Sequence, residues 1–136
     1  MFETNLDGEG FQTRMLDNGI HEYRWQSTER GAVDAWMEYN DMLYSTTNLD
    51  TTLRFLHVIS SAKFPPISYV VRKAQQLQSK YPEQPATRSA ILFQSRFFGG
   101  FINTLSTLLN RKSRDKTRVF SMDERDKAID WLLGND

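Results

Sequence analysis

The chain has 136 residues, which is enough for one domain with a hydrophobic core of its own. Its 17 basic and 17 acidic residues cancel, so no overall field attracts a nucleic acid or an anionic membrane. The absence of cysteine excludes disulfide bonds, thiolate metal sites and cysteine nucleophiles. The sequence shows neither a signal peptide nor an apolar run near the roughly 18 residues that span a bilayer, which favours a cytoplasmic protein.

Two short strands joined by a tight turn open the predicted fold, after a lead-in over residues 1–10 that we expect to be flexible. The strands are expected at 11–16 and 20–26. Asn18-Gly19, in the turn between them, tolerates the positive φ that a tight hairpin needs. This stretch therefore predicts an antiparallel hairpin.

The second of these strands carries an aromatic face. His21, Tyr23 and Trp25 alternate with other residues, so their side chains lie on one side of the strand. This face either packs beneath a helix or lies exposed as an interface. The sequence leaves both alternatives open.

Helices and strands alternate over the rest of the chain. We expect helices near 29–46, from Pro65 to Tyr81, from Phe98 to Leu109 and from Ala128 to Leu133, and strands at 53–59, 89–93 and 117–120. In the first helix only Asn40 interrupts the apolar stripe. The order β-β-α-β-α-β-α-β-α predicts a single α/β domain over residues 11–136, with a mixed β-sheet and helices packed on it.

The last helix has a defined start and stop. Ser121 and Glu124 have the spacing of a capping box, and Gly134 suits the left-handed conformation that ends many helices. The apolar strands and this helix are expected to supply part of the core. The residues that we predict to be buried there are Leu56, Val58, Leu92, Trp131 and Leu132.

The closing stretch combines the pair Val119-Phe120, a capped acidic turn, Ala128 and the pair Trp131-Leu132. With the element order, the helix that contains Trp36 and the apolar strand at 53–59, it resembles the STAS-like domains. These include the bacterial anti-sigma-factor antagonists and their SpoIIAA-like relatives. The resemblance implies a non-enzymatic regulatory module that works through protein–protein contact, in some members switched by phosphorylation of a serine.

In those members the phosphorylated serine lies at the start of the helix after the third strand, within an Asp-Ser-Ser/Thr-Gly pattern. The corresponding stretch here is FPPISYV, which has neither Asp nor Gly, and Ser68 is its candidate phosphoacceptor. Ser60 and Ser61 belong to the end of the preceding strand. We therefore expect a structural turn at this point, without a kinase switch.

No convincing catalytic set occurs in the sequence. His57 and Ser60 lie three residues apart on a predicted strand, which turns their side chains to opposite faces. We expect His57 to be a buried sheet residue. His21 and His57, the two histidines of the chain, lack the spacing of a metalloprotease helix. We expect no enzymatic activity, no metal and no cofactor.

A dense basic run follows the third predicted helix. It consists of Arg111, Lys112, Arg114, Lys116 and Arg118. These cations either complement the dipole of that helix or form a patch for weak binding of an anion or an acidic partner. The run contains no aromatic residue on which bases would stack, so we expect no binding of nucleic acid.

Phe97, Phe98 and Phe101 form a candidate interface. They lie so close in sequence that a helix starting there cannot turn all three inward. Since aromatic side chains are enriched at interface cores, we expect contact with a protein partner or self-association, as in a homodimer.

These observations favour a non-enzymatic regulatory or protein-interaction module. The alternative is a carrier of a small anionic or lipidic ligand, held between the helices and the sheet with basic residues at the mouth. Such a carrier needs a closed pocket of several hundred cubic ångströms, which the structure can test.

Overall fold

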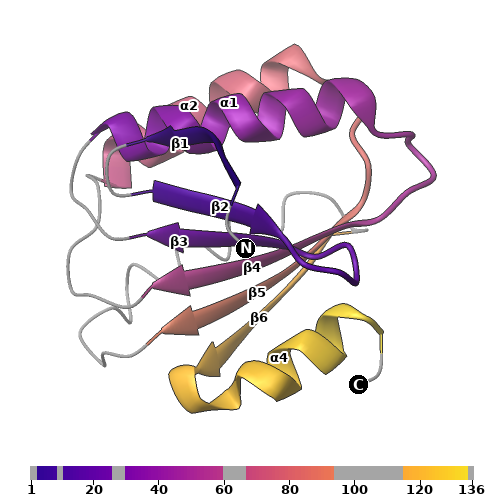
Figure 1. The fold of residues 1–136 in the computed structure, drawn as a ribbon. Helices are drawn as coiled ribbons and strands as arrows, with labels where there is room; N and C mark the ends of the chain where they lie inside the picture. The colour runs from indigo at the N-terminus through magenta and orange to yellow at the C-terminus, as the bar shows by residue number, and fades with distance from the viewer. Residues whose placement is uncertain (1–2, 9–10, 26–29, 60–66, 94–114, 135–136) are drawn as a thin grey trace.

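The computed structural model describes residues 3–8, 11–25, 30–59, 67–93 and 115–134. In this part of the chain six strands form one mixed sheet, with two long helices on one face and a shorter helix on the other (Figure 1). The elements are β1 (Glu3–Gly8), β2 (Phe11–Met15), β3 (His21–Trp25), α1 (Arg30–Thr46), β4 (Leu53–Ile59), α2 (Ile67–Lys80), β5 (Thr87–Phe93), β6 (Lys116–Ser121), the 3-10 turn η2 (Met122–Glu124) and α4 (Arg125–Leu132).

The strands lie side by side in chain order, from β1 at one edge to β6 at the other. The first three are antiparallel, and those from β3 to β6 are parallel. Parallel neighbours need a crossover, and α1 and α2 supply the crossovers from β3 to β4 and from β4 to β5. The predicted α/β domain with a mixed sheet is confirmed at this level.

Strand β1 is the main departure from the expected order. We predicted a flexible lead-in over residues 1–10, but Glu3–Gly8 pairs antiparallel with β2. Its sequence, ETNLDG, lacks the apolar alternation by which strands are recognised. An edge strand is held by backbone hydrogen bonds to one neighbour, so this pattern is not required. The expected helix from Phe98 to Leu109 lies outside the described residues.

Buried side chains form one cluster on each face of the sheet. The larger cluster lies beneath α1 and α2 and includes Tyr23 and Trp25, so the aromatic face of β3 packs under a helix rather than in the open. The second cluster lies between the sheet and α4. All five residues predicted for the core are buried in it: Leu56, Val58, Leu92, Trp131 and Leu132.

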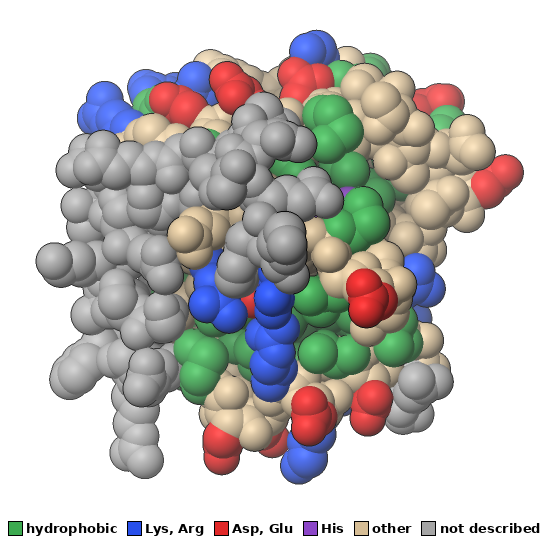
Figure 2. All heavy atoms as spheres, viewed as in Figure 1, with side chains coloured by type: hydrophobic (Ala, Val, Ile, Leu, Met, Phe, Trp, Pro, Cys, Tyr) green, Lys and Arg blue, Asp and Glu red, His purple; other side chains and the backbone are tan. Residues whose placement is uncertain are grey.

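The surface carries charges of both signs. In Figure 2 charges of both signs lie at the top and bottom of the molecule, and in the middle of that face hydrophobic side chains lie beside Lys and Arg side chains. Among the described residues, the large hydrophobic side chains that are exposed are Met15, Met42, Leu49 and Leu133, none of them aromatic. No helix in the described ranges has the length and apolar character needed to cross a membrane.

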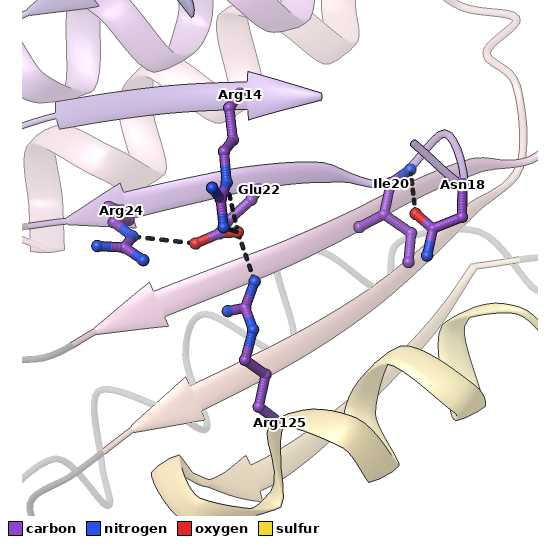
Figure 3. Close-up of polar contacts among 6 residues, drawn as sticks. All are labelled: Arg14, Asn18, Ile20, Glu22, Arg24 and Arg125. Carbon is purple, nitrogen blue, oxygen red and sulfur yellow. Dashed lines mark hydrogen bonds and ion pairs between the residues drawn. The ribbon is translucent and has the colours of Figure 1, made fainter. Parts of the chain in front are cut away.

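Both predicted glycine positions adopt the left-handed conformation. Gly19 closes the β2–β3 hairpin with φ of 85°, and the neighbouring Asn18 side chain accepts the backbone N–H of Ile20 at 3.3 Å (Figure 3). Gly134 has φ of 85° and donates its N–H to the carbonyl of Trp131 at 3.0 Å, which ends α4 as predicted.

Candidate functional site

His57 lies in β4 on the face that α1 and α2 cover, and it is fully buried. Its Nδ1 accepts the indole N–H of Trp25 at 3.2 Å. Because an indole nitrogen can only donate, Nδ1 is unprotonated and the neutral ring carries its proton on Nε2. Burial lowers the pKa of His57 to about 3, so the ring is neutral near pH 7. The predicted buried sheet histidine is confirmed.

A small, partly open cavity lies beside His57, between the sheet and the two long helices. Its volume is about 40 Å³, taken as the space open to the centre of a water molecule. A space of this size holds about three water molecules. Its walls come from α1 (Trp36, Met37, Asn40, Tyr44), α2 (Ala74, Leu77, Gln78), the sheet (Tyr23, Phe55, His57, Thr87, Ser89) and the residues Gln84 and Asp115.

Four residues that line the cavity each carry a buried polar atom without a hydrogen-bond partner in the part of the chain that the structure describes. These atoms are Trp36 Nε1, His57 Nε2, Gln78 Oε1 and Ser89 Oγ. His57 and Ser89 are fully buried, and Trp36 is 2 % exposed. A buried polar atom without a partner costs about 1–3 kcal/mol, so four of them around one small cavity require an explanation.

Other polar groups on the same walls are paired within the protein. The Tyr23 hydroxyl donates to Asn40 Oδ1 at 2.8 Å, and Asp115 Oδ1 accepts the backbone N–H of Thr87 at 3.1 Å. These bonds fix their own side chains in place.

The arrangement favours binding over nucleophilic chemistry. His57 and Ser89 line the same cavity, but a serine nucleophile needs a neighbouring base that can take its proton. Nε2 of His57 already carries a proton, because Trp25 occupies Nδ1 as a donor. Asp115 does not orient the imidazole as a triad acid would, since Trp25 fills that position.

The described residues on the cavity walls carry little charge. Asp115 is the single ionisable acid among the described residues that line the cavity, and they include neither lysine nor arginine. The basic mouth expected for an anionic ligand is therefore not found among the described residues of these walls. The volume is also far below the several hundred cubic ångströms that a lipidic ligand needs.

The other predicted site residues do not meet at this cavity. Ser68 is exposed on the first turn of α2, while Ser60 and Ser61 lie outside the described residues. Lys116 and Arg118 are exposed on the edge strand β6. The remaining members of the basic run and of the aromatic segment lie outside the described residues: Arg111, Lys112, Arg114, Phe97, Phe98 and Phe101.

A buried ion cluster occupies the opposite face of the sheet (Figure 3). The Glu22 side chain has no exposed surface, and its Oε1 accepts hydrogen bonds from Arg14 Nε at 3.1 Å and Arg125 Nη2 at 2.7 Å. Its Oε2 accepts from Arg24 Nε at 3.0 Å. Burial raises the pKa of Glu22, but the hydrogen bonds and charge of the arginines outweigh it and hold this pKa below its usual value. The Glu22 cluster links the hairpin to α4.

No family model matches the sequence, and neither a curated protein nor a solved structure matches it. The resemblance to STAS-like domains therefore remains an expectation from the sequence. Within the described ranges no three histidine, aspartate or glutamate side chains are grouped as metal ligands would be.

Individual polar residues in apolar segments pointed to the cavity, but the sequence did not predict that they would lie together in one site. Asn40 interrupts an apolar helix stripe, and His57 and Ser89 are polar residues in strands that are otherwise apolar. Each of these residues is also compatible with a core position whose polar atoms are hydrogen-bonded within the protein. The unpaired atoms lie on α1, β4, α2 and β5, so only the packing of these elements brings them to one place.

Proposed function

We propose that the chain is a non-enzymatic regulatory module of the STAS-like type, with a small ligand in the cavity beneath α1 and α2 as its input. The alternation of parallel strands with covering helices supports the first part. The observation that carries the second part is that four of the residues lining one cavity each have a buried polar atom without a hydrogen-bond partner among the described residues.

A binding role explains why these walls are polar. Much of this face of the sheet is apolar, as at Phe55, Ile59 and Ile91, and apolar replacements of Gln78 or Ser89 would remove the cost of their unpaired atoms. A ligand that hydrogen-bonds to these atoms offsets that cost. Because such a ligand binds the folded chain and not the unfolded chain, its binding also stabilises the fold.

Three small probes of similar size and different charge test the ligand site: acetamide, acetate and ethylammonium. The unfolding temperature and the indole N–H signal of Trp36 are followed as each probe is added to the 136-residue chain. We expect a saturable change with at least one probe, lost in Ser89→Ala and kept in Ser68→Ala, the exposed-serine control. A chain that responds to none of the three does not contain the proposed ligand site.

We further propose that the regulatory output is a protein contact, self-association included, through the segment of Phe97, Phe98 and Phe101. This part of the proposal is supported by the sequence, in which the three aromatic residues lie too close together for a helix to turn all of them inward.

Sedimentation equilibrium at tens of micromolar chain tests this output. We expect a dimer that Phe98→Asp or Phe101→Asp dissociates, because a charge cannot be buried unpaired at an aromatic interface. Met42→Asp, at an exposed position on α1, is the control and should leave the dimer intact. A wild-type chain that is strictly monomeric contradicts self-association.

A further inference from the structure

We infer that the three arginines of the Glu22 cluster bind a phosphate dianion, either as the free ion or as the monoester of a small molecule. This site lies on the face of the sheet that carries α4, so it is separate from the cavity beneath α1 and α2. Three properties of the cluster support it: the convergence of its side chains, their charge and their access to solvent.

Three guanidinium groups reach the Glu22 carboxylate from three sides (Figure 3). Arg14 Nη2 and Arg125 Nη2 lie 3.0 Å and 2.7 Å from the same oxygen, Oε1. These two nitrogen atoms are therefore within about 6 Å of each other, a distance at which like charges repel. Arg24 Nε lies 3.0 Å from the other oxygen, Oε2. One carboxylate thus holds three cations close together.

The cluster contains more positive charge than its carboxylate neutralises. Three guanidinium charges against one carboxylate charge leave two positive charges on these four side chains. A single bidentate arginine is enough to pair a buried carboxylate, so the second and third arginines add repulsion between cations. An anion beside them would offset this repulsion. A phosphate monoester, with a charge of about −1.5 to −2 at pH 7, matches the excess.

Solvent reaches the arginines but not the carboxylate between them. The Glu22 side chain is 0 % exposed, whereas the side chains of Arg14, Arg24 and Arg125 are 23 %, 36 % and 32 % exposed. Helix α4 packs mainly on β4, β5 and β6 (Figure 1). Arg14 and Arg24 lie on β2 and β3, beside the part of the face that α4 covers. A dissolved anion can therefore meet the guanidinium groups without displacing Glu22.

A phosphate group fits the donors that arginines present. Each guanidinium has five N–H groups in a planar fork, and three of them offer more donors than the two Glu22 oxygens can accept. The fork matches two oxygens of a phosphate, which has further oxygens for a second arginine. A carboxylate has fewer oxygens and a single charge, so it should bind more weakly. A ligand as small as phosphate cannot bind more tightly than the micromolar range, so titrations run to tens of millimolar.

Titration of the ¹⁵N-labelled chain at pH 7 with inorganic phosphate and with glycerol phosphate tests this site. Sodium chloride keeps the ionic strength constant, because screening weakens contacts between exposed charges. We expect both phosphates to shift the arginine Nε–H signals of the cluster saturably, and acetate to bind at least about 10-fold more weakly. Single Arg→Lys variants assign these signals. The phosphate that binds more tightly identifies the source, the free ion or a monoester.

Two substitutions in the cluster should change the affinity for phosphate in opposite directions. Arg24→Gln removes a cation and a charge-assisted hydrogen bond, so phosphate binding should weaken about 10-fold or more. Arg14 and Arg125 still hold Glu22 in this variant. Glu22→Gln removes the competing negative charge, so phosphate binding should tighten at least about 3-fold. Arg72→Gln, at an exposed position on α2, is the matched control and should bind phosphate like the wild type.

Three results would overturn the phosphate site. The first is a wild-type chain whose cluster signals show no saturable response to either phosphate. The second is acetate binding as tight as phosphate binding, or a folded Glu22→Gln variant that binds phosphate no more tightly than the wild type. The third is an equal loss of phosphate binding in Arg24→Gln and Arg72→Gln. An unchanged circular dichroism spectrum shows that each variant is folded, and the cavity probes, which are followed at Trp36, report on the other face independently.

Discussion

At the scale of single residues, the two histidines of the chain are both buried and both neutral. Burial lowers the pKa of His57 to about 3 and that of His21 to about 4. Each ring is also held by a specific partner: His21 Nδ1 lies 2.9 Å from the Tyr39 hydroxyl, and His57 Nδ1 accepts from Trp25. Neither histidine is placed to act as a proton switch near pH 7.

We expect neither imidazole to titrate between pH 8 and pH 5. The Cε1–H signals of both rings in ¹H–¹³C spectra should stay constant over this range, because their folded pKa values lie below it. An unfolded sample of the same chain is the control and should show both rings titrating near pH 6.5. A folded-state midpoint near pH 6.5 for either histidine would show that the ring is solvated.

Glu22 is the corresponding residue on the other face, a carboxylate kept ionised by three arginines. We expect Glu22→Gln to lower the free energy of unfolding at pH 7 by about 1.5–3 kcal/mol, since hydrogen bonds to a charged group are lost. Glu38→Gln, the same change at an exposed position on α1, is the control and should change it by about 0.5 kcal/mol or less.

The effect of Glu22→Gln should depend on pH with a definite sign. The pKa of Glu22 is lowered in the folded chain, so its contribution to the free energy of unfolding is fully present above the unfolded pKa of 4.5. The contribution is lost as the pH falls through the folded pKa. Urea unfolding at several pH values should therefore show the variant and the wild type converging below pH 4.5, and a difference that grows with acid would contradict the assignment.

At the scale of elements, α4 is held at both ends by side chains. Glu124 accepts the backbone N–H of Ser121 at 3.0 Å in the predicted capping box. At the other end Arg54 Nε donates to the carbonyl of Leu132 at 2.7 Å, and Arg88 Nε donates to that of Trp131 at 2.6 Å. Cations at a helix C-terminus also complement its dipole. The helix is therefore fixed to β4 and β5 by both charge and packing.

We expect Leu132→Ala to lower the free energy of unfolding by about 2–5 kcal/mol, because this α4 side chain is fully buried between the helix and the sheet. Leu133→Ala, at the next position, is the matched control. Leu133 is 36 % exposed, so its truncation should cost far less. Equal effects of the two substitutions in chemical denaturation, or a cost below about 0.5 kcal/mol for Leu132→Ala, would mean that the packing face of α4 is misassigned.

The elements that could be predicted are those whose apolar residues recur with a clear helical or strand periodicity or form a short apolar run. The helix expected at 29–46 is found at Arg30–Thr46, and the strand expected at 53–59 is found at Leu53–Ile59. Strand β1 could not be predicted, because its sequence lacks the apolar alternation of a recognisable strand; it pairs with β2 through its backbone and lies against α1. The Glu22 cluster also escaped prediction, since its arginines come from β2, β3 and α4 and only the fold brings them together.

At the scale of the whole molecule, the sheet separates two different environments. Helices α1 and α2 cover one face of the sheet, and α4 covers the other (Figure 1). The face beneath α1 and α2 holds aromatic and polar groups and the cavity, while the face beneath α4 holds the Glu22 cluster and the second apolar cluster. The charges that anchor α4 belong to the second environment. Substitutions in the two clusters should therefore act independently, because the sheet lies between them.

The two environments nevertheless respond to acid in the same direction. His21 and His57 are neutral in the folded chain, and their pKa values rise to about 6.5 when the chain unfolds, so as the pH falls below 6.5 the unfolded state binds up to two more protons. Glu22 acts in the same sense below pH 4.5, because its folded pKa is lowered. None of these three groups contributes more to the stability of the fold as the pH falls.

We therefore expect the free energy of unfolding to fall by about 2–4 kcal/mol between pH 7.5 and pH 5, at up to about 1.4 kcal/mol per pH unit for each histidine. Urea unfolding of the chain at pH 7.5, 6.0 and 5.0 measures this decrease. His57→Gln removes one of the two titrating groups and should roughly halve it, whatever the substitution does to stability at pH 7.5. A free energy of unfolding that is constant from pH 7.5 to pH 5 would require histidines with ordinary pKa values in the folded chain, and would contradict their burial beneath α1 and α2.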